Sequence, residues 1–241
     1  MNTLDSAMHP WYGHEEFFRH FDFSKYRFKV DWISSRSPII KDPSYVYLFL
    51  DVDSLKTHPN IDLRRKTLEN RILTENIEKT SQTTLQEEYL EIRVKSQTEM
   101  INICREQKKY DLALYFALQL KSKCPENSYI NRLITELLLD IYYLKGKGVP
   151  THIVARQKHT DYLVDIKNFI LNITEEEIIE LAYHFLNNQS NFDSSSQKHY
   201  LLLKRICKET GRKEVNERIT ARYIREFGNK IVEDEYVIPK F

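Results

Sequence analysis

Glycine and proline are scarce in this sequence: its 241 residues include 5 glycines and 7 prolines. Average proteins contain about 7% glycine and about 5% proline. Few residues are therefore present that break a helix or force a turn. Leucine, isoleucine, glutamate and lysine are frequent, so the composition favours long helices.

Cysteine is also rare, and the three cysteines are odd in number and far apart in the sequence. This spacing fits neither a disulfide framework nor a paired C-x-x-C zinc site, so it favours a reducing compartment, the cytoplasm. Because free cysteines are commonly buried as small apolar side chains, we expect all three to lie in the core. They are Cys104, Cys124 and Cys207.

Neither an excess of charge nor a long apolar run is present. The 36 basic and 35 acidic side chains nearly cancel, so no overall field attracts nucleic acid or anionic lipid. The longest apolar run, LITELLLDIYYL, contains Glu136 and Asp140 and is shorter than the roughly twenty residues that span a bilayer. The N-terminus, MNTLDSAMHPWYGHEEF, has no basic stretch followed by an apolar one, which argues against a signal peptide. The sequence therefore predicts a soluble chain without a membrane span.

Several motifs of enzymes and nucleotide-binding proteins are missing. The sequence has no G-x-G-x-x-G, no G-x-x-x-x-G-K-[ST] and no G-x-S-x-G, so it predicts neither a phosphate-binding loop nor a nucleophile elbow. Residues 204–230 carry nine lysines and arginines against four glutamates. A basic helix can contact nucleic acid or an acidic partner, but this one has no arrangement that would read bases. We therefore do not expect nucleic-acid binding.

The first of two predicted domains, residues 1–80, is rich in aromatic side chains. Residues 11–32 alone contain nine of them. Four apolar residues in this stretch alternate with polar ones at a period of two, which predicts a short strand within an otherwise irregular segment. These residues are Tyr26, Phe28, Val30 and Trp32.

The second predicted domain, residues 86–241, has apolar residues at helical spacing nearly throughout. The pattern predicts helices over 86–107, 110–123 and 128–145, and the glycines and proline that follow are typical helix-stop signals. The apolar stripe of the first of these helices is Tyr89, Ile92, Met100, Ile101 and Cys104.

A further helix is predicted to begin at Thr174, which stands three residues before Glu177 in the spacing of a capping box. Two last helices flank Gly211. Successive helices with short connections predict a mostly α fold of antiparallel helical hairpins, with the aromatic-rich N-terminal segment packed against them. The apolar face of the helix after Thr174 is Ile178, Ile179, Leu181, Ala182, Phe185 and Leu186.

The stretch YDLALYFALQLKSKCPEN combines two small residues, an apolar residue and a closing proline at helical spacing. It resembles the second helix of a tetratricopeptide repeat, where small residues let paired helices approach and the proline ends the unit. The resemblance is partial and covers about residues 94–145. The residues that match the repeat are Ala113, Ala117, Leu120 and Pro125. Two positions differ from it: Gln97 stands where the repeat has a large apolar residue, and Lys147 stands where the next unit would have a small one.

This resemblance implies a tetratricopeptide-like stack in which one face of the helices holds a protein partner. The alternative is a generic all-α domain, because any antiparallel helical pair with small residues at its contact shows the same pattern. The candidate partner-binding residues, chosen by helix face, are Tyr110, Tyr115, Asn131, Arg132 and Tyr142.

A second resemblance concerns LKTHPNIDLRRKTL, residues 55–68. Thr57, His58 and Pro59, followed by Arg64, resemble a motif near the end of the catalytic domain in zinc metallopeptidases of the HtpX and CAAX prenyl protease family. The resemblance implies that His58 and Arg64 would lie beside a zinc site and stabilise a developing oxyanion.

The zinc-binding motif of that family is missing. Its chemistry needs H-E-x-x-H on a helix, so that two histidines one turn apart bind zinc and the glutamate activates water. In GHEEFFRHF, His14 and Glu15 are present as weak candidate zinc ligands, but Phe18 occupies the position of the second histidine. His20 lies about 120° away from His14 around a helix and cannot replace it.

Two functions are compatible with these observations. The favoured one is a non-catalytic helical-repeat scaffold that binds a protein partner and needs no cofactor. The alternative is a remnant or partial subunit of an HtpX-like zinc metallopeptidase, with its catalytic core on another polypeptide or with a zinc site of a different arrangement. The oligomeric state is left open by the sequence.

Overall fold

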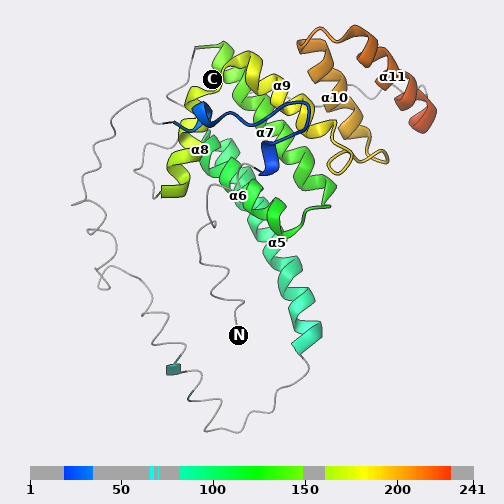
Figure 1. The fold of residues 1–241 in the computed structure, drawn as a ribbon. Coiled ribbons are helices and arrows are strands. Elements are labelled where there is room, and N and C mark those ends of the chain that lie inside the picture. Colours follow the sequence, from blue (N-terminus) through cyan, green and yellow to red (C-terminus); the bar gives the residue numbers. More distant parts are fainter. Residues whose placement is uncertain (1–18, 35–65, 68–69, 71–81, 149–160, 229–241) are drawn as a thin grey trace. The chain divides into compact units, whose positions relative to one another are not determined.

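The structure, a computed structural model, describes residues 19–34, 66–67, 70, 82–148 and 161–228 (Figure 1). It confirms the mostly α fold. The predictions made for His14, Glu15, His58 and Arg64 lie outside the described residues. The elements are the 3-10 helix η1 (Val30–Trp32) and the α-helices α5 (Gln82–Glu106), α6 (Tyr110–Lys123), α7 (Ser128–Gly146), α8 (Asp161–Asn172), α9 (Glu175–Leu186), α10 (Gln197–Glu209) and α11 (Lys213–Phe227).

Residues 19–34 and 94–228 belong to one compact unit, which contains η1, the later turns of α5 and helices α6 to α11. Described residues between 66 and 93 belong to another unit, and they comprise three helical residues and the first turns of α5. Among the described helices, none is both long and apolar enough to cross a membrane.

Local signals place α6 and α7 where the sequence predicted them. Asn127 caps α7, since its side-chain Oδ1 accepts hydrogen bonds from the backbone N–H groups of Tyr129 (3.0 Å) and Ile130 (3.3 Å). The helix ends at Gly146, and Gly148 follows with a φ of 71°, a conformation that glycine adopts without steric cost.

The start of α9 confirms the predicted capping box. The Glu177 backbone N–H donates to Thr174 Oγ1 (3.2 Å), and the Thr174 backbone N–H donates to Glu177 Oε2 (3.0 Å). All six predicted apolar residues of this helix are buried. The reciprocal bonds satisfy two backbone donors that a helix start leaves unpaired.

The helices pack as stacked hairpins, as the sequence predicted (Figure 1). Helix α6 packs against α7 and α8, α7 against α9 and α10, and α10 against α9 and α11. Gly211, with a φ of 66°, makes the turn between α10 and α11. The core between these helices is apolar, and its largest fully buried side chains include Leu114, Leu118, Ile134, Leu137, Phe169 and Phe185.

Ala113 and Ala117 are fully buried in α6. Two of the three cysteines, Cys104 and Cys207, are buried as expected, but Cys124 is only half-buried at the end of α6. The expectation for Cys124 is therefore wrong. All three thiols are free.

The predicted strand near residue 30 is also wrong. Residues 30–32 form η1, in which the Ile33 backbone N–H donates to the Val30 carbonyl at 3.1 Å. Trp32 is buried, whereas Val30 is 70% exposed. Three of the four alternating residues, Tyr26, Phe28 and Trp32, are at least partly buried. The alternation therefore reflects the burial of these rings and not a pleated strand.

Of the apolar stripe predicted for α5, the side chain of Tyr89 lies outside what the structure describes, and the described members are buried only near the end of the helix. Ile101 and Cys104 are buried, but Ile92 and Met100 are 63% and 47% exposed. A sequence period identifies one face of a helix, but it does not show how much of that face other elements cover.

Candidate partner-binding face

One side of α7 carries a row of polar and aromatic side chains, named here the α7 stripe. Steps of three or four residues place its members one above another along the helix. Tyr129 is exposed at the start of the row, the Asp140 side chain is almost fully buried, and the others are half-buried. The members are Tyr129, Arg132, Glu136, Asp140 and Tyr143.

Arg105, from the last turn of α5, joins the middle of the stripe. Its Nε donates to Asp140 Oδ2 (2.5 Å), its Nη2 donates to Asp140 Oδ1 (3.2 Å), and its Nη1 donates to Glu136 Oε2 (2.7 Å). Burial alone would lower the pKa of Arg105, but the two carboxylates raise it above the ordinary arginine value. The guanidinium is therefore permanently charged and fixes both carboxylates.

Arg132 is held differently. Its guanidinium carbon lies 4.7 Å from the centre of the Tyr129 ring, and its ion pair with Glu136 Oε1 is 3.7 Å long. That distance is too long for a hydrogen bond. The ring orients the guanidinium while its N–H donors make no hydrogen bond to any described residue. Such a group can donate to a carboxylate or a carbonyl of another molecule.

At the other end of the stripe, Tyr143 meets α10. Its hydroxyl donates to Glu209 Oε1 (2.7 Å) and accepts from Arg205 Nε (2.7 Å), and the Arg205 guanidinium lies 5.2 Å from the ring. Burial, with the nearby Glu209, raises the pKa of Tyr143 to about 12, although Arg205 opposes the shift. The hydroxyl is thus a neutral donor at physiological pH.

The predicted partner-binding residues have different environments. Tyr110, Tyr115 and Asn131 are buried in the unit, with exposed fractions of 2%, 9% and 1%. Arg132 and Tyr142 are half-buried and retain access to solvent. Arg132 is in the α7 stripe, and Tyr142 is beside its end, where its hydroxyl donates to Glu209 Oε2 (3.3 Å).

In the sequence, Glu136 and Asp140 stood out only as interruptions of an apolar run. Their spacing from Arg132 and Tyr143, four or three residues at each step, was the available signal for a polar row. No local signal could identify Arg105 or Arg205, because both reach the stripe from other helices.

Burial lowers the pKa of each of the described histidines, His20, His184 and His199. Among the described residues, no three histidine, cysteine, aspartate or glutamate side chains are grouped to hold a metal ion. His20 Nε2 lies 3.0 Å from Ser122 Oγ. Burial and the nearby Lys121 lower the pKa of His20 to about 4, which makes its ring a weak base at neutral pH.

Comparison of the chain with family models, with curated proteins and with solved structures found no match.

Proposed function

We propose that this chain is a non-catalytic helical scaffold that binds a protein partner through the α7 stripe. The observation that carries the proposal is the stacking of Arg132 on the exposed ring of Tyr129, with guanidinium donors left for another molecule. Arginine and tyrosine are among the side chains that most often dominate the binding energy of protein interfaces.

The surroundings of Arg132 support this proposal. Arg105 already bonds both carboxylate oxygens of Asp140 and one oxygen of Glu136. The charge of Glu136 is therefore shared, and Arg132 is incompletely neutralised. Because its position is set in advance by the Tyr129 ring, little side-chain entropy would be lost on binding.

The proposal includes a cytoplasmic location and a tetratricopeptide-like arrangement of the stack. The three free cysteines support a reducing compartment. Buried Ala113 and Ala117 on α6 support close packing of paired helices.

Site-specific photo-crosslinking tests the proposal. Benzoylphenylalanine is placed at Tyr129 in cells that naturally make the protein, and a matched control carries it at Ile224, which is exposed on α11. We expect an adduct of one discrete mass from position 129 and none of that mass from position 224. Mass spectrometry of the adduct identifies the partner and the crosslinked segment.

An Arg132→Ala substitution in the Tyr129 probe background is the second arm. We expect the adduct to fall at least tenfold, which corresponds to about 1.4 kcal/mol of binding free energy. Equal adducts at positions 129 and 224, or an adduct that is unchanged by Arg132→Ala, would contradict the proposed face.

A further inference from the structure

His199, near the start of α10, lies between the first residue of α7 and the loop of residues 187–196, named here the α9–α10 loop. The His199 Nε2 is 2.9 Å from the Ser128 carbonyl oxygen, and the Asp193 backbone N–H donates to the His199 Nδ1 at 3.0 Å. The residue is 1% exposed. Both ring nitrogens are therefore used inside the protein, and the ring connects the α9–α10 loop to α7.

These two hydrogen bonds determine the protonation state of the ring. A carbonyl oxygen only accepts, so Nε2 carries a hydrogen, and a backbone N–H only donates, so Nδ1 has a free lone pair. The neutral imidazole with its hydrogen on Nε2 satisfies both partners. A second proton would add to Nδ1 and place two N–H groups against each other. The charged ring therefore cannot keep its hydrogen bond to Asp193.

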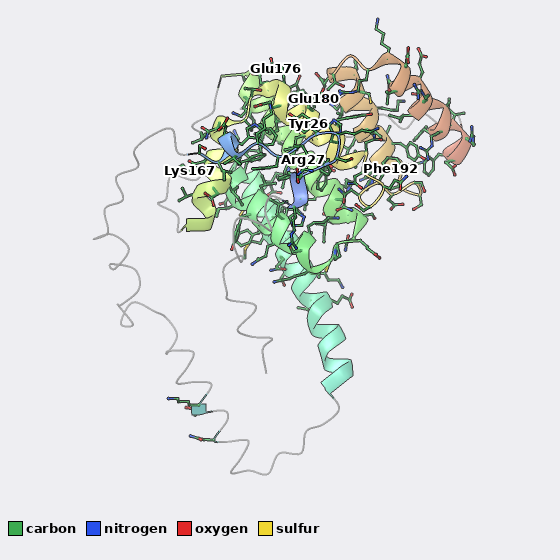
Figure 2. The ribbon with its side chains drawn as sticks, in the orientation of Figure 1. Tyr26, Arg27, Lys167, Glu176, Glu180 and Phe192 are labelled. Atoms are coloured by element: carbon green, nitrogen blue, oxygen red, sulfur yellow. The ribbon has the colours of Figure 1, made fainter. Side chains whose placement is uncertain are left out.

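The α9–α10 loop has further contacts around this histidine. Figure 2 shows Phe192 in the loop, and its ring centre is 6.0 Å from that of His199. The Asp193 carboxylate accepts from the hydroxyl and the backbone N–H of Ser195, at 2.6 and 2.9 Å. Hydrogen bonds from Ser195 and Ser128 lower the pKa of Asp193, although burial opposes them, so this carboxylate is ionised at neutral pH. The loop is thus tied to the start of α7 through Asp193 as well as His199.

Charged groups from two neighbouring elements act on the His199 ring. Burial lowers the pKa of His199. The Ser128 carbonyl opposes this effect, as do the charges of Asp193 on the loop and Glu136 on α7, whereas Arg132 on α7 acts in the same direction as burial. The neutral ring is therefore favoured while the loop is closed on α7. When the loop is open and the ring is in water, its pKa returns to the ordinary histidine value of about 6.5.

This histidine also lies beside the start of the α7 stripe. Tyr129 directly follows Ser128 in α7, and Arg132 is one turn further along. Arg132 and Glu136 are both close enough to His199 to affect its pKa. A charged ring would place a second positive charge near Arg132, and it would attract Glu136, the carboxylate with which Arg132 is paired. The neutral ring holds the main chain beside Tyr129 without either effect.

We propose that neutral His199 is a positioning residue for Tyr129 and Arg132, and that its protonation detaches the α9–α10 loop from α7 and weakens partner binding in acid. The detachment of the loop depends on the contacts within this chain, whereas the effect on binding rests on the proposed function of the α7 stripe. Because the open loop binds the proton more tightly than the closed loop, the equilibrium constant for closing falls by up to tenfold per pH unit below about pH 6.5.

Nitrogen-15 NMR of the full wild-type chain tests the loop. At pH 7.5 we expect a His199 ring with Nδ1 unprotonated and Nε2 protonated. On acidification the ring should titrate below about pH 6.5, and the Asp193 amide proton should move upfield with the same midpoint, because it loses its acceptor. Three results would overturn the proposal: a ring that titrates at a higher pH, an Asp193 amide that does not follow the ring, or a ring that stays neutral until the helices unfold.

The same spectra report the connection to the α7 stripe. We expect the Tyr129 backbone amide and the Arg132 Nε–H to shift with the midpoint of His199. The variant His199→Asn offers an oxygen near the place of Nδ1 but does not titrate, so these shifts should disappear. The matched control His184→Asn removes another half-buried histidine and should leave them unchanged. Signals of Tyr129 and Arg132 that stay constant while the ring titrates would contradict the positioning role.

Photo-crosslinking from position 129 in lysate, at pH 7.5 and pH 5.5, measures the effect on the partner. We expect about three- to tenfold less adduct at pH 5.5 from the chain with His199, and equal adduct at both pH values from His199→Asn. Adduct that does not change with pH in the presence of His199, or that falls equally in both chains, would overturn the regulation and leave the proposed function intact. No adduct at either pH would overturn the proposed function and the binding half of this proposal, while the NMR titration would still decide the detachment of the loop.

Discussion

Arg105 and Asp140 form a two-pronged ion pair that connects the end of α5 to α7, with N–O distances of 2.5 and 3.2 Å. The Asp140 side chain is 1% exposed. A carboxylate this deeply buried requires a cation and hydrogen bonds to compensate for its lost hydration. The pair therefore determines where the end of α5 sits on the α7 stripe.

Breaking this pair should be costly. Arg105→Met leaves Asp140 buried without its cation, and we expect a loss of about 3–5 kcal/mol in the free energy of unfolding. Urea denaturation followed by circular dichroism measures the change. The double variant Arg105→Met/Asp140→Leu removes both charges and should recover much of the loss. A loss below about 1 kcal/mol for Arg105→Met would mean that the ion pair is not maintained in solution.

The capping box of α9 should contribute a smaller amount. Thr174→Ala removes the acceptor for the Glu177 backbone N–H, so we expect about 1 kcal/mol of destabilisation in the same assay. Thr174→Ser keeps the hydroxyl and is the matched control. If both variants lose equal stability, the hydroxyl hydrogen bond is not the cause.

Acid should release residues 19–34, called the strap, from the helices on which they pack, because His20 within the strap and His184 beneath its Tyr26 ring are less basic in the folded state. Burial and the nearby Lys121 lower the pKa of His20 to about 4. Burial also lowers the pKa of His184, with Arg212 and Lys25 acting in the same direction and Glu180 opposing them. An unperturbed histidine has a pKa of about 6.5, so when residues 19–34 are released, His20 and His184 bind protons that they do not bind in the docked state.

The sign follows from proton linkage. Docking of residues 19–34 is favoured above about pH 6.5. As the pH falls below that value, each histidine lowers the docking equilibrium constant by up to tenfold per pH unit, until the pH reaches the pKa of that histidine in the folded state. Glu177 adds to this at lower pH. Burial alone would raise its pKa, but hydrogen bonds from Lys29 and the Thr174 backbone lower it, so its protonation also weakens the docked state.

Trp32 reports strap release directly. Trp11→Phe leaves it as the only tryptophan, and we expect its emission to shift to longer wavelength between about pH 6.5 and pH 4 while helical circular dichroism persists. Adding His20→Gln or His184→Gln should move the transition to lower pH. Emission that stays constant down to pH 4 would contradict the assignment of these histidines.

Zinc analysis addresses the metallopeptidase alternative. For protein purified without chelator or metal-affinity resin, we expect well below one zinc per chain, because a site that lacks its second histidine loses the ligand count needed for tight binding. Near-stoichiometric zinc would favour the alternative. His14, Glu15, His58 and Arg64 would then be the residues to substitute next.

The sequence by itself determined the features that depend on neighbouring residues. The limits of α6 follow from local periodicity, and the start of α9 follows from the Thr174 and Glu177 capping box. These signals act over three or four residues, so they are visible before any tertiary contact is known. The buried face of α9 was predictable for the same reason.

Only the tertiary structure decided which polar residues meet. Arg105 reaches Asp140 from another helix, and Asn172 holds Trp32 across 140 positions of sequence. Contacts between residues far apart in the sequence also explain why residues 30–32 form η1 and not the predicted strand. The Trp32 ring packs against Phe169 of α8, and the backbone adopts the conformation that this packing requires. Propensity is a weak preference of a fraction of a kcal/mol per residue, and burial of one large ring exceeds it.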